Sequence, residues 1–363
     1  MARSCQLACC GVERNCAAGL ALAHGDNPYG VYPLSYSFKL DNVTFYAPNL
    51  NPPISLPGLA FLSRFDPLDA FWAWFAISVV LYLVTLALLA FAFSRTLTFV
   101  HLFWAVSVWG FWQTLQIGNI YIVAFAIVAA AWLSMDRGHH CAAALFVGTL
   151  VAMKPQFGLW ALALFIIGYQ RTALVAVAIA GVLTIAPVLP FGPDVYRQWL
   201  NALTSYDYLA FTENVSLIGM ASRANIPALG FVASVLMVGA SLFWLWRFRP
   251  DWRQASALAL VTVLVASPTA WPANGLCLLP YLLSRRVWTP PMGIAAGIMV
   301  IPSWLIWVIA SVVGVTKYNF GLAGDLYCLG FLLLSTELIR QIRSTAALRT
   351  GVPIPPPRTP YAW

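Results

Sequence analysis

The chain has 363 residues, of which 61% are hydrophobic and only 9% are charged. This composition excludes a soluble domain with a large core and indicates an integral membrane protein. The formal net charge of +8 does not indicate a nucleic-acid partner. The basic residues lie mostly in short loops between apolar runs, where arginine marks the cytoplasmic side of a membrane.

Four of the seven cysteines lie within the first sixteen residues, and the other three lie in apolar segments. This distribution does not form a disulfide framework. The cysteine cluster has no paired C-x-x-C and no histidine at ligand spacing, so we expect no metal site.

Residues 1–66 are polar, aromatic and rich in proline, which predicts an irregular extracytoplasmic segment with a few turns. The apolar runs that follow are long enough to cross a bilayer or nearly so. The first three predict alternating crossings over 68–93, 97–115 and 120–135.

Lys154 is the only charge in the apolar stretch 141–168. A lysine at membrane depth usually faces a cavity and marks a functional site. Pro155 follows it directly and disfavours helix at Lys154, so the stretch should break into two arms, each too short to span the membrane. We predict a hairpin with Lys154 at its tip; the alternative is a lysine that snorkels from an ordinary helix end.

The next runs predict a crossing over 173–189, a polar outer loop over 191–225 and a return crossing over 226–246. A second interrupted run, 255–283, breaks at SPTAWP (267–272) and predicts another hairpin. Two further crossings follow, over 291–313 and 322–339. We assign three regions: the outer segment 1–66, a transmembrane domain 67–343 that includes the 191–225 loop, and a proline-rich cytoplasmic tail 344–363.

If both hairpins turn back, the arginines between the runs fall on one face, which should be cytoplasmic. They are Arg95, Arg137, Arg171, Arg247, Arg249, Arg253, Arg285, Arg286, Arg340, Arg343 and Arg349. The N-terminal segment, the Lys154 tip, the outer loop and the SPTAWP tip then share the opposite face. We therefore predict an all-α, polytopic membrane protein with short broken helices around an extracytoplasmic cavity.

Six strings occur in order along the chain: NLNPPISLPGLAFLSRFDPLDAFWAW, LQIGNIYIVAFAIVAAAWL, GTLVAMKPQFGLWALAL, FGPDVYRQWLNAL, ENVSLIGMASR and ASPTAWPANGLCLLPYLL. Together they resemble glycosyltransferase family 87, whose members are bacterial membrane mannosyltransferases of the GT-C fold. The resemblance runs from about Ala18 to about Leu283. It implies inverting transfer of a sugar, typically mannose, from a polyprenyl-phosphate carrier to a lipid or glycan acceptor at the outer face of the inner membrane. No cofactor, obligatory metal or nucleotide sugar is implied.

The residues suit this chemistry independently of the resemblance. A lipid-phosphate leaving group needs a fixed cation, which Lys154 supplies and Arg223 could add to. Polar or stacking side chains for sugar or acceptor are Gln116, Asn119, Gln156, Asn214, Ser216 and Trp271. Each except Gln156 has a structural alternative: helix contacts for Gln116 and Asn119, capping for Asn214 and Ser216, and an interfacial anchor for Trp271.

The general base is the weakest match to the family pattern. Members carry an Asp a few residues before an alanine-glycine pair, after a first transmembrane helix. Here the pair is Ala18 and Gly19, and Glu13 is the carboxylate nearest before it. The candidate bases are therefore Glu13, Asp26 and Asp41, whereas Asp66 and Asp69 suit a helix start. Either the chain lacks its true start, or it has lost the first helix and the base together and with them its activity; we expect the former.

Two other classes of function remain open. A secondary transporter also uses broken helices and a buried lysine. A non-catalytic membrane protein that binds lipid phosphate is the other alternative. The expected partners are a polyprenyl-phosphate sugar donor, its acceptor and membrane lipids.

Overall fold

The computed structural model describes residues 10–32, 36–40, 43–47, 49–94, 97–205, 209, 211–312 and 322–350. These residues form a helical bundle, with one small hairpin of β1 (Tyr36–Leu40) and β2 (Val43–Ala47). Four helical segments of this part are long and apolar enough to cross a membrane: α4 (Pro67–Ala92), 170–191, α14 (Pro227–Phe248) and α19 (Leu322–Thr350). The prediction of an all-α polytopic membrane protein is confirmed.

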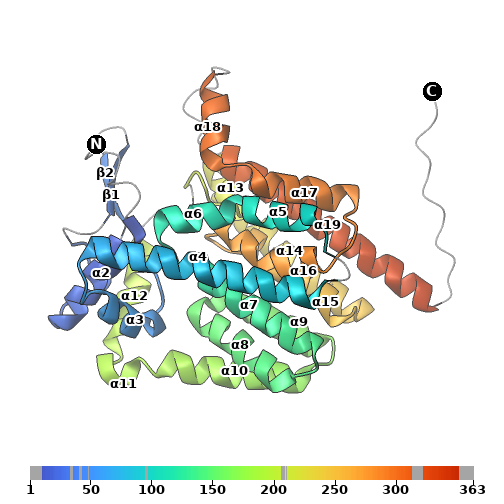
Figure 1. The fold of residues 1–363 in the computed structure, drawn as a ribbon, viewed down its shortest axis with the longest axis horizontal. Helices are drawn as coiled ribbons and strands as arrows, with labels where there is room; N and C mark the ends of the chain where they lie inside the picture. Colours follow the sequence, from blue (N-terminus) through green and yellow to red (C-terminus); the bar gives the residue numbers. More distant parts are fainter. Residues whose placement is uncertain are drawn as a thin grey trace.

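The long helix α4 runs the length of the bundle (Figure 1). It begins at Pro67, and the Asp66 carboxylate caps it by accepting a hydrogen bond from the Leu68 amide at 3.0 Å. Proline suits the first turn because its missing N–H would have no partner there. In the middle, the fully buried Tyr82 donates to the Ala105 carbonyl at 2.7 Å. The predicted helix, which is long and apolar enough to cross a membrane, and the structural role of Asp66 are confirmed.

The apolar stretch around Lys154 forms a hairpin. Its arms are α8 (His140–Met153) and α9 (Gly158–Ile166), with a 3₁₀ turn, η2 (Pro155–Phe157), between them. The rings of His140, at the start of α8, and Tyr169, just after α9, lie 5.5 Å apart. The two arms therefore begin and end at the same end of the bundle, and Lys154 lies at the other.

The second interrupted run is also a hairpin. Its first arm is α15 (Trp252–Ala266), and its second consists of η3 (Pro272–Leu278) and α16 (Leu279–Leu283). The buried ring of Trp132 contacts both Trp252, at a centroid distance of 5.0 Å, and Tyr281, at 6.4 Å. Because Trp252 starts one arm and Tyr281 lies near the end of the other, the arms are antiparallel.

Two expected crossings are interrupted. The 97–115 run forms α5 (Phe99–Ser107) and α6 (Trp109–Ile117), which meet at the non-helical Val108. The 291–313 run forms α17 (Pro290–Val300) and α18 (Ser303–Val312), which are separated at Pro302. Indole hydrogen bonds hold both breaks, from Trp104 to the Ala296 carbonyl and from Trp109 to the Ser303 hydroxyl. Hydropathy alone does not reveal such breaks.

The other crossings are continuous. They are α7 (Tyr121–Asp136), α10 (Gln170–Ile185), which the short α11 (Val188–Phe191) follows, α14 and α19. The last helix continues to Thr350, beyond the predicted tail boundary at 343.

The expectation of an irregular N-terminal segment is wrong for much of its described part. It forms α2 (Cys10–Ala23), the β-hairpin, η1 (Pro53–Ser55) and α3 (Leu56–Leu62). Gly19 allows α2 to touch α3, since a Cβ built on it would lie 2.2 Å from the Leu59 carbonyl oxygen. The 191–225 loop likewise contains α12 (Asp194–Ser205) and α13 (Leu217–Arg223). α2, α3, α12 and the β-hairpin gather at the left end in Figure 1.

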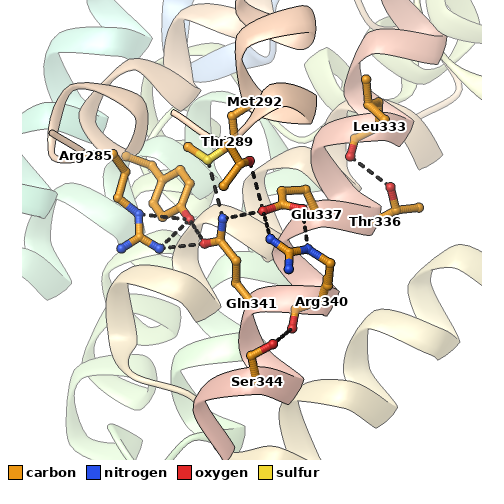
Figure 2. Close-up of polar contacts among 10 residues, drawn as sticks. Arg285, Thr289, Met292, Leu333, Thr336, Glu337, Arg340, Gln341 and Ser344 are labelled. Atoms are coloured by element: carbon orange, nitrogen blue, oxygen red, sulfur yellow. Dashed lines mark hydrogen bonds and ion pairs between the residues drawn. The ribbon is translucent and has the colours of Figure 1, made fainter. Parts of the chain in front are cut away.

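α15 and α16 lie toward the opposite end, on the right in Figure 1. Arg253 is in the first turn of α15 and Arg285 follows α16, so this end is called the arginine-rich end below. Here Arg285 donates to the Tyr281 hydroxyl and to Gln341 Oε1, and Gln341 donates to Glu337 at 2.8 Å (Figure 2). Glu337 also accepts from Arg340 at 2.7 Å. Arg95 of the predicted cytoplasmic set lies outside the described residues. The end that carries Lys154 is called the outer end.

Candidate functional site

The Lys154 tip is the centre of the candidate site. Lys154 ends α8, where its amide donates to the Leu150 carbonyl, and its φ of −149° and ψ of 94° are extended. Pro155 explains this conformation because its ring disfavours helix in the residue before it. Two short arms therefore present a half-buried ammonium between them.

Tyr121, the first residue of α7, holds this ammonium. Lys154 Nζ donates to the Tyr121 hydroxyl at 3.2 Å and lies 4.3 Å from the centre of its ring. Attraction to the ring and the hydrogen bond both favour the charged amine in one position. The sequence pattern did not single out Tyr121, although it lies two residues after the predicted ligand Asn119. It directly follows residues 118–120, which are called the GNI turn below.

That turn joins α6 to α7 and contains one predicted sugar ligand, Asn119; another, Gln116, lies just before it. Gly118 ends α6 with a φ of 69°, a left-handed conformation that glycine adopts at low cost. Asn119 Oδ1 accepts from the Ile120 amide at 2.7 Å, and Gln116 is exposed on the last turn of α6. Gln156, in η2, is half-buried. Gln116 and Asn119 lie close along the chain to Tyr121, and Gln156 lies in the turn of the Lys154 hairpin.

The outer loop and the second hairpin are joined through Asn214. Its amide nitrogen donates to the carbonyls of Leu209 and Pro268, and its Oδ1 accepts from the amides of Ser216 and Ala270. The side chain is 1% exposed. The capping interpretation is confirmed for Ser216, whose hydroxyl accepts from the Gly219 amide at the start of α13. Their prediction as sugar ligands stays a prediction.

Gln113 and Glu213 join the same region to the bundle core. Gln113 Nε2 donates to Glu213 Oε2 at 2.6 Å, while Gln113 Oε1 accepts from the Ala273 amide at the start of η3. Burial raises the pKa of the Glu213 carboxyl above its ordinary range, and hydrogen bonds from Ser303 and Gln113 oppose that rise. No sequence pattern pairs residues that lie one hundred positions apart.

Arg223 forms an ion pair with Asp325 at the start of α19, and its Nη1 donates to the Phe211 carbonyl at 2.7 Å. Only 10% of its side chain is exposed. Its described contacts are therefore structural, and its prediction as a phosphate ligand stays a prediction. Trp271 is half-buried at the second tip and packs edge-on against Phe211 at 5.1 Å.

The structure describes the three candidate bases to different extents. Glu13 belongs to α2, but only its backbone is described. Asp41 lies outside the described residues. Asp26 is exposed in the turn after α2, where its amide donates to the Ala21 carbonyl. The assignment of the base stays a prediction.

The first residues of α2 whose side chains the structure describes are well packed. Asn15, Cys16 and Ala17 are buried, and Cys16 packs against Phe71 of α4. In the part of the chain that the structure describes, no group of three or more His, Cys, Asp or Glu side chains could hold a metal ion.

Comparison with known proteins gives one match. The family model of glycosyltransferase family 87 matches residues 49–268. That range contains the Lys154 tip, Tyr121, the GNI turn and the outer loop, and it ends at the second hairpin. No curated protein and no solved structure matches the chain.

Proposed function

Since the chain belongs to glycosyltransferase family 87, we propose that it transfers a hexose, with mannose as the expected sugar, from a polyprenyl-phosphate carrier to a lipid or glycan acceptor. The transfer takes place at the outer face of the inner membrane of a bacterium. One observation carries the proposal: a lysine on a broken helix, fixed by Tyr121 at the end of the bundle opposite the arginines.

The chemistry follows from the leaving group. The acceptor oxygen forms a bond to the anomeric carbon as the bond from that carbon to the carrier phosphate breaks, and the electron pair of that bond stays on the phosphate oxygen. A cation that is fixed beforehand at that oxygen stabilises the charge that develops there. Lys154 supplies this cation, and Tyr121 keeps it in place.

The acceptor hydroxyl loses its proton as it attacks. The base must therefore lie on the side of the sugar opposite the leaving phosphate. Glu13, Asp26 and Asp41 are the candidates, and all three belong to the N-terminal segment. Packing contacts support a position of the described part of this segment near the outer end: α2 packs on α3 and α4, and Trp199 of α12 donates to the Leu50 carbonyl at 3.1 Å. Gln116, Asn119, Gln156 and Trp271 are proposed to contact the sugar or acceptor.

The test is transfer by the full chain in membrane vesicles. Mannose labelled with a radioisotope is supplied on polyprenyl phosphate and, in parallel, on a nucleotide. We expect label to pass covalently to an acceptor from the lipid donor only. Uptake of label without covalent transfer would indicate a transporter, and donor binding without transfer would indicate a lipid-phosphate-binding protein; either result overturns the proposal.

The same assay identifies the base. Glu13→Gln, Asp26→Asn and Asp41→Asn each remove one carboxylate with little change in shape, so only the variant of the true base should lose transfer while it still binds donor. If all three transfer sugar at the wild-type rate, the base lies outside this set.

A further inference from the structure

A cavity of about 600 Å³ opens at the arginine-rich end, across the bundle from Lys154. The last turns of α4 and α7, the first turn of α15 and the end of α16 meet around it. Its polar lining includes Ser94, Asp136, Asp251, Arg253, Ser284 and Arg285. The volume lies within the ordinary range for a small-molecule site.

The charged groups of this lining balance. Among the described residues of the lining, two carboxylates, Asp136 and Asp251, face two guanidinium groups, Arg253 and Arg285, so that their charges sum to zero. A site for an anion would carry an excess of positive charge. This lining instead offers acceptors for a cation and donors for an anion within one cavity.

Some of these charged groups already have partners within the protein. Arg253 is paired with Asp136, and Asp251 Oδ1 caps α15 by accepting from the amides of Arg253, at 2.8 Å, and Gln254, at 3.1 Å. A carboxylate can accept about four hydrogen bonds. Asp251 can therefore accept further hydrogen bonds from a ligand while it still caps α15.

Gln254 adds a second, independent observation. It lines the cavity and is 5% exposed, and its buried Oε1 has no hydrogen-bond partner among the described residues. Buried polar atoms are nearly always paired. A small rotation of the amide toward the cavity would let this oxygen accept from a donor bound there.

The residues around the cavity are of the kinds that gather at the level of lipid headgroups, and we infer that the cavity lies at this depth. Its walls are helix ends, and the half-buried Trp252 and Trp288 lie in or beside the same segments. Tryptophan and arginine gather at the level of headgroups in membrane proteins. A ligand at this depth with one positive and one negative group is the headgroup of a zwitterionic phospholipid.

We propose that this cavity binds the headgroup of a phospholipid that carries a primary ammonium, such as phosphatidylethanolamine. The ammonium faces Asp251, Asp136 and Gln254, and the phosphate faces Arg285 and Ser284. The Arg285 network in Figure 2 keeps the guanidinium at the cavity wall through Tyr281 and Gln341. This site does not depend on the transfer reaction at the outer end.

The test uses the purified full chain in detergent and measures lipid binding by native mass spectrometry. Phosphatidylethanolamine, phosphatidylcholine and phosphatidylglycerol with identical acyl chains are compared. We expect phosphatidylethanolamine to bind about tenfold more tightly than the other two. The reason is that choline has no N–H to donate, glycerol has no positive charge, and a hydrogen bond to a charged group is strong enough for this difference.

Asp251→Asn tests the carboxylate, because asparagine still caps a helix but carries no charge. Asp66→Asn is the matched control, since Asp66 caps α4 at the other end of the bundle. We expect Asp251→Asn to lower the phosphatidylethanolamine affinity about tenfold and Asp66→Asn to leave it unchanged.

Several results would overturn the proposal. They are equal binding of the three lipids, a preference for phosphatidylglycerol, and equal losses in the two asparagine variants. Displacement of the bound lipid by an equal concentration of glycerophosphoethanolamine would also overturn it, because the ligand would then be a soluble molecule. The comparison of lipids on the wild-type chain decides the matter even if a variant fails to fold.

Discussion

Replacing Asn214 by alanine should release the outer loop from the second hairpin. The side chain makes four hydrogen bonds to backbone groups, two as donor and two as acceptor. Each is worth about 0.5–1.5 kcal/mol net. Alanine also leaves the buried amide of Ala270 and the carbonyl of Pro268 without this partner. We therefore expect a loss of about 3 kcal/mol in the free energy of unfolding.

Thermal unfolding of the purified protein in detergent measures this loss. At about 2 °C per kcal/mol for a chain of this size, the Tm should fall by about 6 °C. Asn201→Ala is the matched control, because Asn201 is exposed on α12. A Tm for Asn214→Ala within about 2 °C of the control would refute the reasoning, since four hydrogen bonds of a buried side chain cannot be lost at so small a cost.

Two further predictions concern α2 and the buried carboxyl. Gly19→Ala should lower the Tm by several degrees because its Cβ would meet the backbone of Leu59, whereas Gly58→Ala, with open space around it, should not; equal Tm values would show that α2 does not pack on α3 as described. Because burial raises the pKa of Glu213, its folded form favours the protonated state, so stability should fall as pH rises from the ordinary carboxyl pKa through the raised value. Glu213→Gln should remove this fall, and identical pH profiles of Tm for variant and wild type would contradict the assignment.

Much of the architecture could be predicted from local chemistry. The Lys154–Pro155 pair predicts a helix break because the proline ring acts on its neighbour. The SPTAWP string does the same for the second hairpin. Continuous apolar runs predict most of the crossings, and the distribution of arginine separates the two ends of the bundle.

The remainder depends on contacts between distant parts of the chain. The break at Val108 has no proline or charge to mark it, and indole hydrogen bonds from Trp104 and Trp109 hold the helices on either side. Helix α2 is short and mixed in polarity, and it is stable because Gly19 lets it pack closely on α3. Such packing determines structure without a periodic pattern in the sequence.

In the candidate site too, some residues could be predicted from the sequence and others only from the fold. Lys154 was identifiable because a charge in an apolar run is costly. Tyr121, its partner, is an ordinary aromatic residue at the start of a helix, and its hydroxyl gains importance only from the fold. Glu213 could be read as a surface acid, but the structure buries it against Gln113 and Ser303.

The central claim is that Lys154 binds the donor phosphate and stabilises the leaving group. The direct measurement is the rate of sugar transfer from a polyprenyl-phosphate donor by wild type, Lys154→Ala and Lys154→Arg at equal amounts of membrane-inserted protein. We expect the alanine variant to lose at least about a hundredfold in rate, as expected when a group that stabilises transition-state charge is removed, and the arginine variant to keep part of the activity. Transfer by Lys154→Ala at the wild-type rate would contradict the account, because the lysine would then only position a helix end.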